Sequence, residues 1–152
     1  MQNTRFIMAA LLSVAATCAW ADAKIAHQLA DRYAAAAKAA DPSYAGLSPV
    51  DGKAFFTREV IQFKGDPSTP GKAIACASCH TANPADPGKH IVTNKPIAPL
   101  SPTVNPKRFK SMADVERKFS KHCNEVVGSD CTAQEKGNYI AYLLTEKTPT
   151  AK

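Results

Sequence analysis

The chain has 152 residues, with 19 basic and 13 acidic side chains and a formal net charge of +6 at pH 7. This length predicts one domain, and a modest positive charge without a basic run gives no indication of a nucleic-acid partner. No paired carboxylates, nucleophile triad or glycine-rich phosphate loop can be named in the sequence, so we expect no conventional enzyme.

The N-terminal segment is typical of a secretory signal peptide. Arg5 gives a positive start, residues 6–16 are apolar, and residues 19–21 form an A-x-A cleavage site. We therefore expect a signal peptide over 1–21 and a single exported, periplasmic domain over 22–152. The apolar run is short for a membrane span and no second one follows, so we expect no stable membrane insertion of the mature chain.

The mature chain is expected to begin with a helix over residues 22–40. This stretch is rich in alanine, the strongest helix former. Ile25, Leu29 and Tyr33 recur within it at the spacing of one helix face, which predicts that the helix packs against the domain.

A second helix is predicted after Ser48, which is an N-cap followed by Pro49 at the first helical position. Phe55 and Phe56 are expected to point from it into a core. The segment 65–71, with two prolines, breaks the pattern before the next motif.

A motif with a defined chemistry follows. Cys76, Cys79 and His80 form the pattern C-x-x-C-H, which attaches a c-type haem. The two thiols would join the haem vinyl groups as thioethers, and the adjacent imidazole would be the proximal ligand of the iron. Zinc sites and redox-active disulfides also use C-x-x-C, but the following histidine and the export signal favour one covalently attached haem c.

The remaining cysteines agree with an oxidising compartment. Cys18 leaves with the signal peptide, and a lipid anchor on it is disfavoured because Thr17 fits a lipobox poorly. Four cysteines then remain, of which two belong to the haem motif. Cys123 and Cys131 are left to form a disulfide around a short loop that contains glycine and aspartate.

Residues 81–106 are rich in proline, which excludes a long helix and predicts an extended loop wrapped around the haem. The prolines are Pro84, Pro87, Pro96, Pro99, Pro102 and Pro106. Ile97, Pro99 and Leu100 are candidates to cover the porphyrin. An ordinary loop anchored by apolar residues explains these three equally well.

A helix is predicted again over residues 111–127. Apolar residues follow helical spacing there, at Met112, Val115, Phe119 and Cys123. This spacing places His122 beside the apolar face of the helix.

The last helix begins at Thr132, which forms a capping box with Glu135, and it carries Tyr139, Tyr142 and Leu143 on one face. Nothing in the chain alternates enough to predict a sheet. The predicted fold class is therefore all-α. We expect a class I-like monohaem cytochrome c with an extra N-terminal helix and a proline-rich haem-wrapping loop, its terminal helices crossing beside the haem.

The sixth ligand of the iron decides the function. The candidates in the mature chain are Met112, His27, His90 and His122. A methionine thioether would make an ordinary high-potential electron carrier. His122 is the favoured ligand because it lies late in the chain, on a helix and beside the Cys123 loop. Met112 suits the core, and the other two histidines suit the surface.

Nearly the whole mature chain resembles the cytochrome c double-prime family and its relatives, the SHP-type oxygen-binding cytochromes. The segments that carry the resemblance are 51–56, 75–81, 91–93, 97–100, 121–124, 130–131 and 140–144. The haem motif alone is generic, whereas the pair His122-Cys123 together with Cys131 is specific.

The resemblance implies that His80 is the proximal ligand and His122 a distal ligand that binds ferric iron and detaches on reduction. SHP-type proteins carry asparagine in place of His122. The implied function is transfer of single electrons between redox partner proteins, coupled to proton uptake by the released imidazole, whose ordinary pKa is about 6.5. The alternative is a protein that binds O2, NO or CO at the open ferrous iron.

Overall fold

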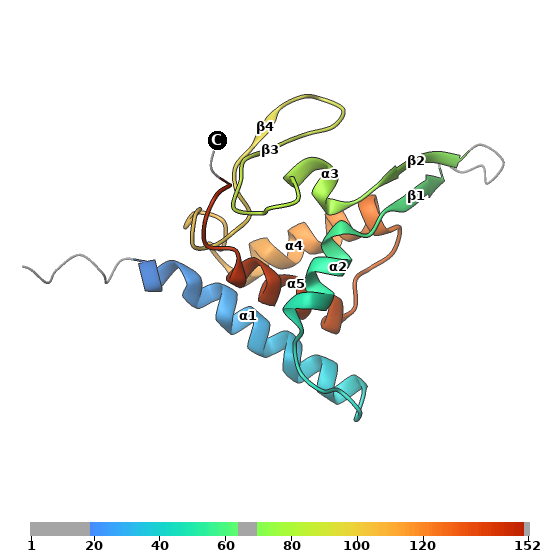
Figure 1. The fold of residues 1–152 in the computed structure, drawn as a ribbon. Coiled ribbons are helices and arrows are strands. Elements are labelled where there is room, and N and C mark those ends of the chain that lie inside the picture. Colours follow the sequence, from blue (N-terminus) through green and yellow to red (C-terminus); the bar gives the residue numbers. More distant parts are fainter. Residues whose placement is uncertain (1–18, 64–69, 151–152) are drawn as a thin grey trace, which may run out of the picture.

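The computed structural model describes residues 19–63 and 70–150, with the backbone alone described at 19–22, 62, 63 and 70. These residues form five α-helices, two antiparallel pairs of short strands and one π-helical turn (Figure 1). In chain order they are α1 (Ala19–Ala40), α2 (Pro49–Thr57), β1 (Val60–Phe63), β2 (Pro70–Ile74), α3 (Cys76–His80), β3 (Gly88–Lys89), β4 (Pro96–Ile97), α4 (Met112–His122), the π-helical turn η1 (Cys123–Val127) and α5 (Ala133–Thr145).

The expected signal peptide lies almost wholly outside the described residues, because the description begins at Ala19. Helix α1 already includes residues 19–21 of the proposed cleavage site. The signal peptide over 1–21 and the domain over 22–152 therefore stay predictions. Within the described part of the chain, no helix is long and apolar enough to cross a membrane.

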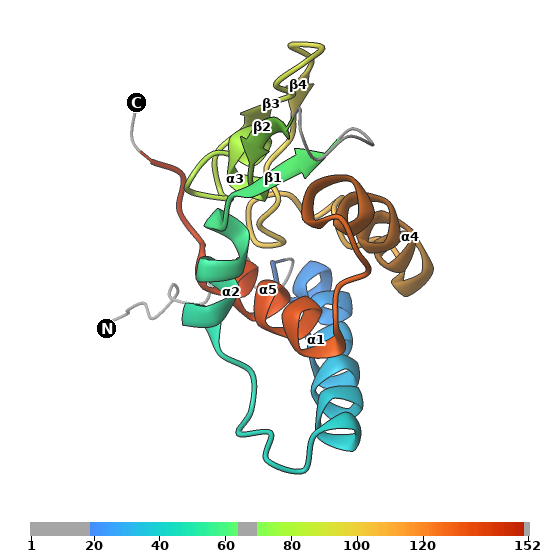
Figure 2. The ribbon, with the colours of Figure 1, turned by 90° about the vertical axis from the view of Figure 1, so that its right-hand side faces the viewer.

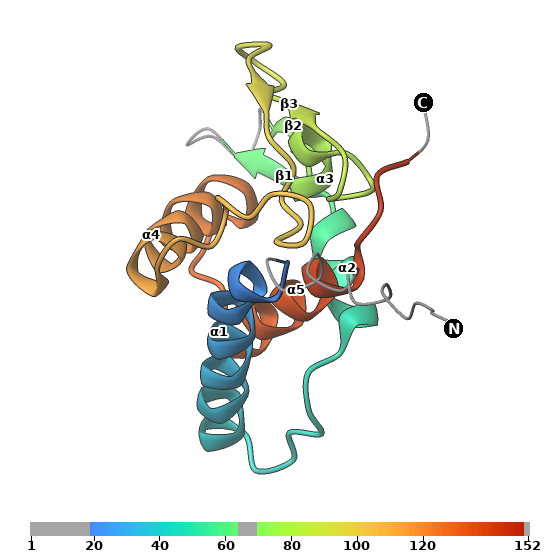
Figure 3. The ribbon, with the colours of Figure 1, turned by 90° about the vertical axis from the view of Figure 1, so that its left-hand side faces the viewer.

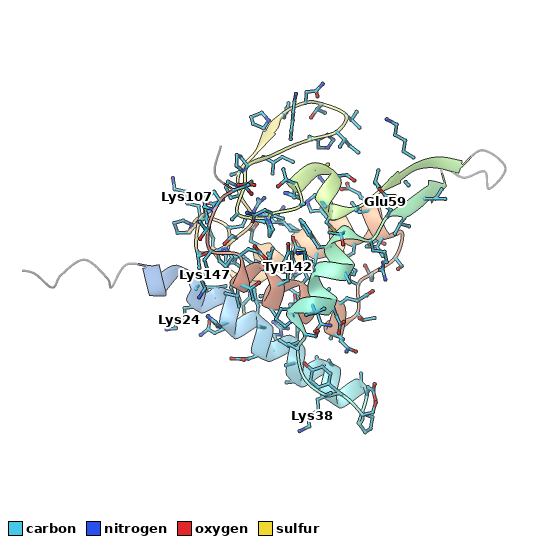
Figure 4. The ribbon with its side chains drawn as sticks, viewed as in Figure 1. Lys24, Lys38, Glu59, Lys107, Tyr142 and Lys147 are labelled. Atoms are coloured by element: carbon cyan, nitrogen blue, oxygen red, sulfur yellow. A yellow bond between two sulfur atoms is a disulfide. The ribbon has the colours of Figure 1, made fainter. Side chains whose placement is uncertain are left out.

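Helices α1, α2 and α5 pack together and form what we call the helical frame (Figures 2 and 3). Leu29, Phe56 and Ile140, one from each helix, are fully buried between them. Tyr142 of α5 lies in the interior, whereas the labelled lysines lie at the periphery (Figure 4). The predicted helix over 22–40 and the burial of Phe55 and Phe56 are both confirmed.

The close approach of α2 to α5 depends on a glycine. A Cβ atom on Gly52 would lie 2.0 Å from the backbone oxygen of Asn138, so no larger residue fits without moving a helix. The buried Asn138 side chain also accepts a hydrogen bond of 2.8 Å from the Ser48 amide. Ser48 is the predicted N-cap of α2, and its hydroxyl accepts from the Asp51 amide at 3.1 Å. One polar network thus caps α2 and fixes it to α5.

The two C-terminal helices both begin at a capping residue, of which only the one before α5 was predicted. The Ser111 hydroxyl accepts from the Asp114 amide at the start of α4. Thr132 and Glu135 form the predicted capping box at the start of α5. The helix expected over 111–127 is confirmed, with a change to π-helical geometry from Cys123 onward.

The expectation of no sheet is wrong. Strand β1 pairs with β2, with Val60 opposite Ile74, and β3 pairs with β4, with Gly88 opposite Ile97. These strands span two to five residues, so they are too short to show an alternating pattern in the sequence, and β2, β3 and β4 also contain proline or glycine. The fold is mostly helical rather than all-α.

The proline-rich segment is an extended loop without a helix between α3 and α4, as predicted. It closes on itself, because the Pro84 carbonyl oxygen accepts from the amides of Leu100 at 2.8 Å and Ser101 at 3.0 Å. The Tyr142 hydroxyl donates to the Ala82 carbonyl oxygen at 3.1 Å and anchors the loop to α5. The wrapping of this loop around a haem stays a prediction.

Candidate functional site

A short helix carries the C-x-x-C-H motif. Helix α3 holds Cys76, Cys79 and His80 within five residues, and both thiols are free. A helix this short is not stable by itself, so its neighbours must hold it. A Cβ atom on Gly88 would lie 2.1 Å from the Cys79 carbonyl oxygen, which places β3 directly against the backbone of α3. Thr81 ends the helix with a φ of 64°, an uncommon conformation for a β-branched residue.

The motif lines a cavity of about 510 Å³, a volume typical of cofactor pockets. Its walls come from α2, the end of β2, α3, the β3–β4 hairpin, the loop before α4, α4 with η1, and α5. The apolar lining includes Phe55, Leu100, Phe109, Phe119, Tyr139 and Leu143. A large, flat apolar group could therefore be enclosed here beside two thiols and an imidazole.

The cavity brings together residues that are far apart in the sequence. Four of the residues singled out from the sequence line it: Cys76, Cys79, His80 and His122. Ile97 and Leu100 of the proline-rich loop also line it, as does His90. Met112 and His27 are not among the lining residues; Met112 packs against the core and His27 is exposed on α1.

His90 is held by its own hairpin. Its Nδ1 atom accepts hydrogen bonds of 3.2 Å from the backbone amides of Val92 and Thr93. Ile91 and Val92 at the tip of the hairpin are exposed apolar residues that line the cavity mouth. One of the two ring nitrogens of His90 therefore stabilises the turn of the hairpin.

The chemistry of α3 suits covalent attachment and metal binding. Burial, together with the charges of Arg108 and His122, lowers the pKa of His80 to about 4. The imidazole is therefore neutral at physiological pH, the state in which histidine binds a metal. Burial is also the main reason that the pKa of the Cys76 thiol is raised to about 11, so this thiol is protonated until it reacts.

His122 is the last residue of α4 and lies at the cavity mouth, with 57% of its side chain exposed. Its Nδ1 atom lies 3.3 Å from Oε2 of Glu125. Burial lowers the pKa of His122, while the Glu125 carboxylate raises it and Lys121 lowers it. The next residue, Cys123, is joined to Cys131 by a disulfide with an S–S distance of 1.96 Å.

Arg108 is a functional candidate that the sequence reasoning missed. It lines the cavity, and one of its terminal nitrogens donates to the Ala98 carbonyl oxygen at 3.3 Å. Its Nε atom is buried and has no hydrogen-bond partner among the described residues. A buried guanidinium nitrogen without a hydrogen-bond partner is unfavourable, so we expect an anionic group to bind Arg108 inside the cavity. The sequence offers little signal for it, because an arginine within a polar loop is ordinary.

These features fit a haem. The free thiols of Cys76 and Cys79 can form its thioethers, and the neutral His80 imidazole can bind iron. The aromatic walls suit a porphyrin, and the unpartnered Nε atom of Arg108 suits one of its carboxylates. The assignment of His80 and His122 as the two axial ligands stays a prediction.

Comparison with known proteins identifies relatives. Residues 42–143 match a family model described as "Domain of unknown function (DUF1924)". The chain is 53% identical to cytochrome c'' of Methylophilus methylotrophus over 132 residues, which are 87% of this chain and 88% of that protein. It is 39% identical over 95 residues to the cytochrome c-type protein SHP of Cereibacter sphaeroides, covering 62% of this chain and 68% of that protein.

Solved structures agree with these matches. The crystal structure of oxidised cytochrome c'' from Methylophilus methylotrophus superposes with a TM-score of 0.76 at 51% identity, covering 84% of this chain and 98% of that one. A solution structure of the same cytochrome, described as giving insights into the structural basis of haem-ligand detachment, has a TM-score of 0.75 at 50% identity, with coverage of 85% and 99%. Oxidised SHP, described as an oxygen-binding cytochrome c, has a TM-score of 0.61 at 37% identity, with coverage of 79% and 96%.

Proposed function

The chain belongs to the cytochrome c'' family, and on that premise we propose that it is a periplasmic monohaem cytochrome that transfers single electrons between redox partner proteins. In this proposal the distal histidine leaves the iron on reduction and takes up a proton. The main observation that supports this proposal is that Cys76, Cys79, His80 and His122 line the same cavity. The family implies a covalently bound haem c, which supplies the one-electron chemistry.

Each of these residues has a separate task in the proposal. Cys76 and Cys79 would hold the haem as thioethers, and His80 would bind its iron permanently. The Arg108 guanidinium would pair with a haem carboxylate and so orient the group in the cavity. His122 is the exchangeable ligand, which is consistent with its exposed position at the end of α4.

The surroundings of His122 explain how release can be coupled to a proton. A His122 imidazole that is not bound to iron could take up a proton at Nε2. Glu125 then accepts from the Nδ1–H group and stabilises the imidazolium, in keeping with its raising influence on the His122 pKa. Reduction should therefore become more favourable as the pH falls through the pKa of the released imidazole.

The first experiment compares visible and electron paramagnetic resonance spectra of the oxidised and reduced haem-loaded protein with those of His122→Ala. We expect low-spin ferric and high-spin ferrous states, and loss of the low-spin ferric signal in the variant. His27→Ala is the matched control, because His27 lies outside the cavity. A sulfur-to-iron band with a low-spin ferrous state would place Met112 on the iron and contradict the proposal.

A second function is favoured by the relation to SHP, which is described as an oxygen-binding cytochrome c. If His122 leaves the ferrous iron, a diatomic gas such as O2, NO or CO can occupy its place. Mixing the reduced protein with oxygen decides between the two. A reversible oxygen adduct supports gas binding, whereas rapid oxidation without an adduct supports electron transfer.

A further inference from the structure

The position of α4 decides where His122 lies, because His122 is the last residue of that helix. Helix α4 stands on the opposite side of α5 from α2 (Figures 2 and 3). Val115 and Phe119 are its buried residues. What fixes α4 to the helical frame therefore fixes the distal imidazole as well.

One ion pair joins α4 to the frame. Lys136 of α5 lies 3.2 Å from Glu116 of α4, between Nζ and Oε2. The two side chains are only 19% and 32% exposed. The Lys136 ammonium also lies 5.6 Å from the ring centre of Tyr33 on α1 and 5.7 Å from that of Phe119 on α4. We call Glu116 and Lys136 the interhelical tie, since they bring three helices to one point.

The other charged groups of α4 cannot replace this tie. Asp114 pairs with Arg117 and Lys118, which belong to the same helix. Lys121 and His122 pair with Glu125 in the adjoining turn η1. Among the described residues, no other ion pair connects α4 with α1, α2 or α5.

The aromatic contacts distinguish the tie from an ion pair on the surface. The Tyr33 and Phe119 rings meet edge to face at 5.9 Å beside the ammonium group. They exclude water from one side of the ion pair, which reduces screening and adds a cation–π attraction. The Tyr33 hydroxyl is also buried, and burial, followed by a side-chain hydrogen bond with Glu116 and the charge of that carboxylate, raises its pKa. The Glu116 carboxylate therefore lies close to a buried hydroxyl group as well as to the Lys136 ammonium.

We propose that the Glu116–Lys136 tie is a positioning pair that sets how readily α4 carries the distal imidazole away from the iron. The inference rests on the proposed role of His122. Glu116 and Lys136 act through the helix and do not touch the iron.

The test uses the full haem-loaded chain and the variant Lys136→Met, which keeps the length of the side chain but removes its charge. We expect the ratio of high-spin to low-spin ferric protein to rise about fivefold. Amide hydrogen exchange in α4 should rise with it, while exchange in α2 and the ferrous spectrum stay unchanged. Lys136→Arg should behave as the original protein, since it keeps the ion pair and the cation–π contacts.

Arg117→Met is the matched control. Arg117 is exposed and pairs only within α4 among the described residues, so its loss should leave the spin ratio unchanged. An equal rise in this control overturns the proposal. Faster exchange of α4 in Lys136→Met without a change in spin state also overturns it, because the tie would then hold the helix without acting on the ligand. An unchanged spin state in His122→Ala would instead contradict the proposed function, and α4 exchange would still show whether the tie holds the helix.

Discussion

The helical frame and the cavity side of the molecule are stabilised in different ways. The frame consists of long helices whose apolar faces meet directly, with Leu29, Phe56 and Ile140 fully buried. The cavity side consists of α3, the β3–β4 hairpin and the α4–η1 segment, whose inner surfaces face a cavity. Folding therefore depends mainly on the frame and ligand exchange mainly on the cavity side, although Phe55, Tyr139 and Leu143 of the frame also line the cavity. Variants should therefore separate loss of stability from changes in the spectrum of the iron.

The largest effect is expected from Phe56→Ala in the frame. Phe56 is fully buried and contacts the rings of Tyr139 and Tyr142, so its removal should cost about 4 kcal/mol of unfolding free energy. Urea unfolding measures this loss, and the ferric spectrum of the folded protein should not change. Val50→Ala on the same helix is the control, since Val50 is 77% exposed. A spectral change in Phe56→Ala would show that the two regions are not separate.

On the cavity side, Gly88→Ala should cost about 3 kcal/mol, because its methyl group would collide with the backbone of Cys79 and His80. Unlike the frame variant, it should also change the visible spectrum of the haem-loaded protein, since it displaces α3. Lys89→Ala, an exposed substitution at the next residue, should change neither property. A Gly88→Ala protein with an unaltered spectrum would mean that the hairpin does not hold α3.

The Cys123–Cys131 disulfide is the next test. Replacing both cysteines by serine should lower the unfolding free energy by about 2.5 kcal/mol through greater chain entropy of the unfolded state. Because the bridge adjoins His122, the ferric high-spin fraction should also increase. Ser129→Ala within the same loop serves as the control. An unchanged ferric spectrum would show that the disulfide stabilises the chain without positioning His122.

Asp114→Asn should give the smallest effect. A hydrogen bond from Lys118, and then the neighbouring Arg117, lowers the pKa of Asp114 in the folded state. Its stabilising contribution is therefore present above the unfolded pKa of about 3.9 and is lost as the pH falls through the lower folded value. The stability advantage of the original protein over the variant should be constant near neutral pH and decrease below about pH 4. Urea unfolding midpoints of both proteins can be measured across this pH range. If the difference between the two midpoints grew as the pH fell, the lowered pKa of Asp114 would be refuted.

The parts of the molecule that depend on local sequence could be predicted. Ser48 and Thr132 cap their helices as expected, because a capping bond joins residues only three positions apart. The C-x-x-C-H motif could also be recognised from the sequence, because it consists of five consecutive residues. The two hairpins were missed, because strands of two to five residues are stabilised by their partners rather than by a local pattern.

The residues that could hold a haem and four of the five α-helices follow from residue type and short spacing, whereas the short helix α3 was not predicted. Only the tertiary structure decided that His90 and His122 line the cavity while Met112 does not. It also revealed the unpartnered Nε atom of Arg108 and the tie between Glu116 and Lys136. These features arise where distant segments meet, and no local pattern encodes the burial and distances that such a meeting creates.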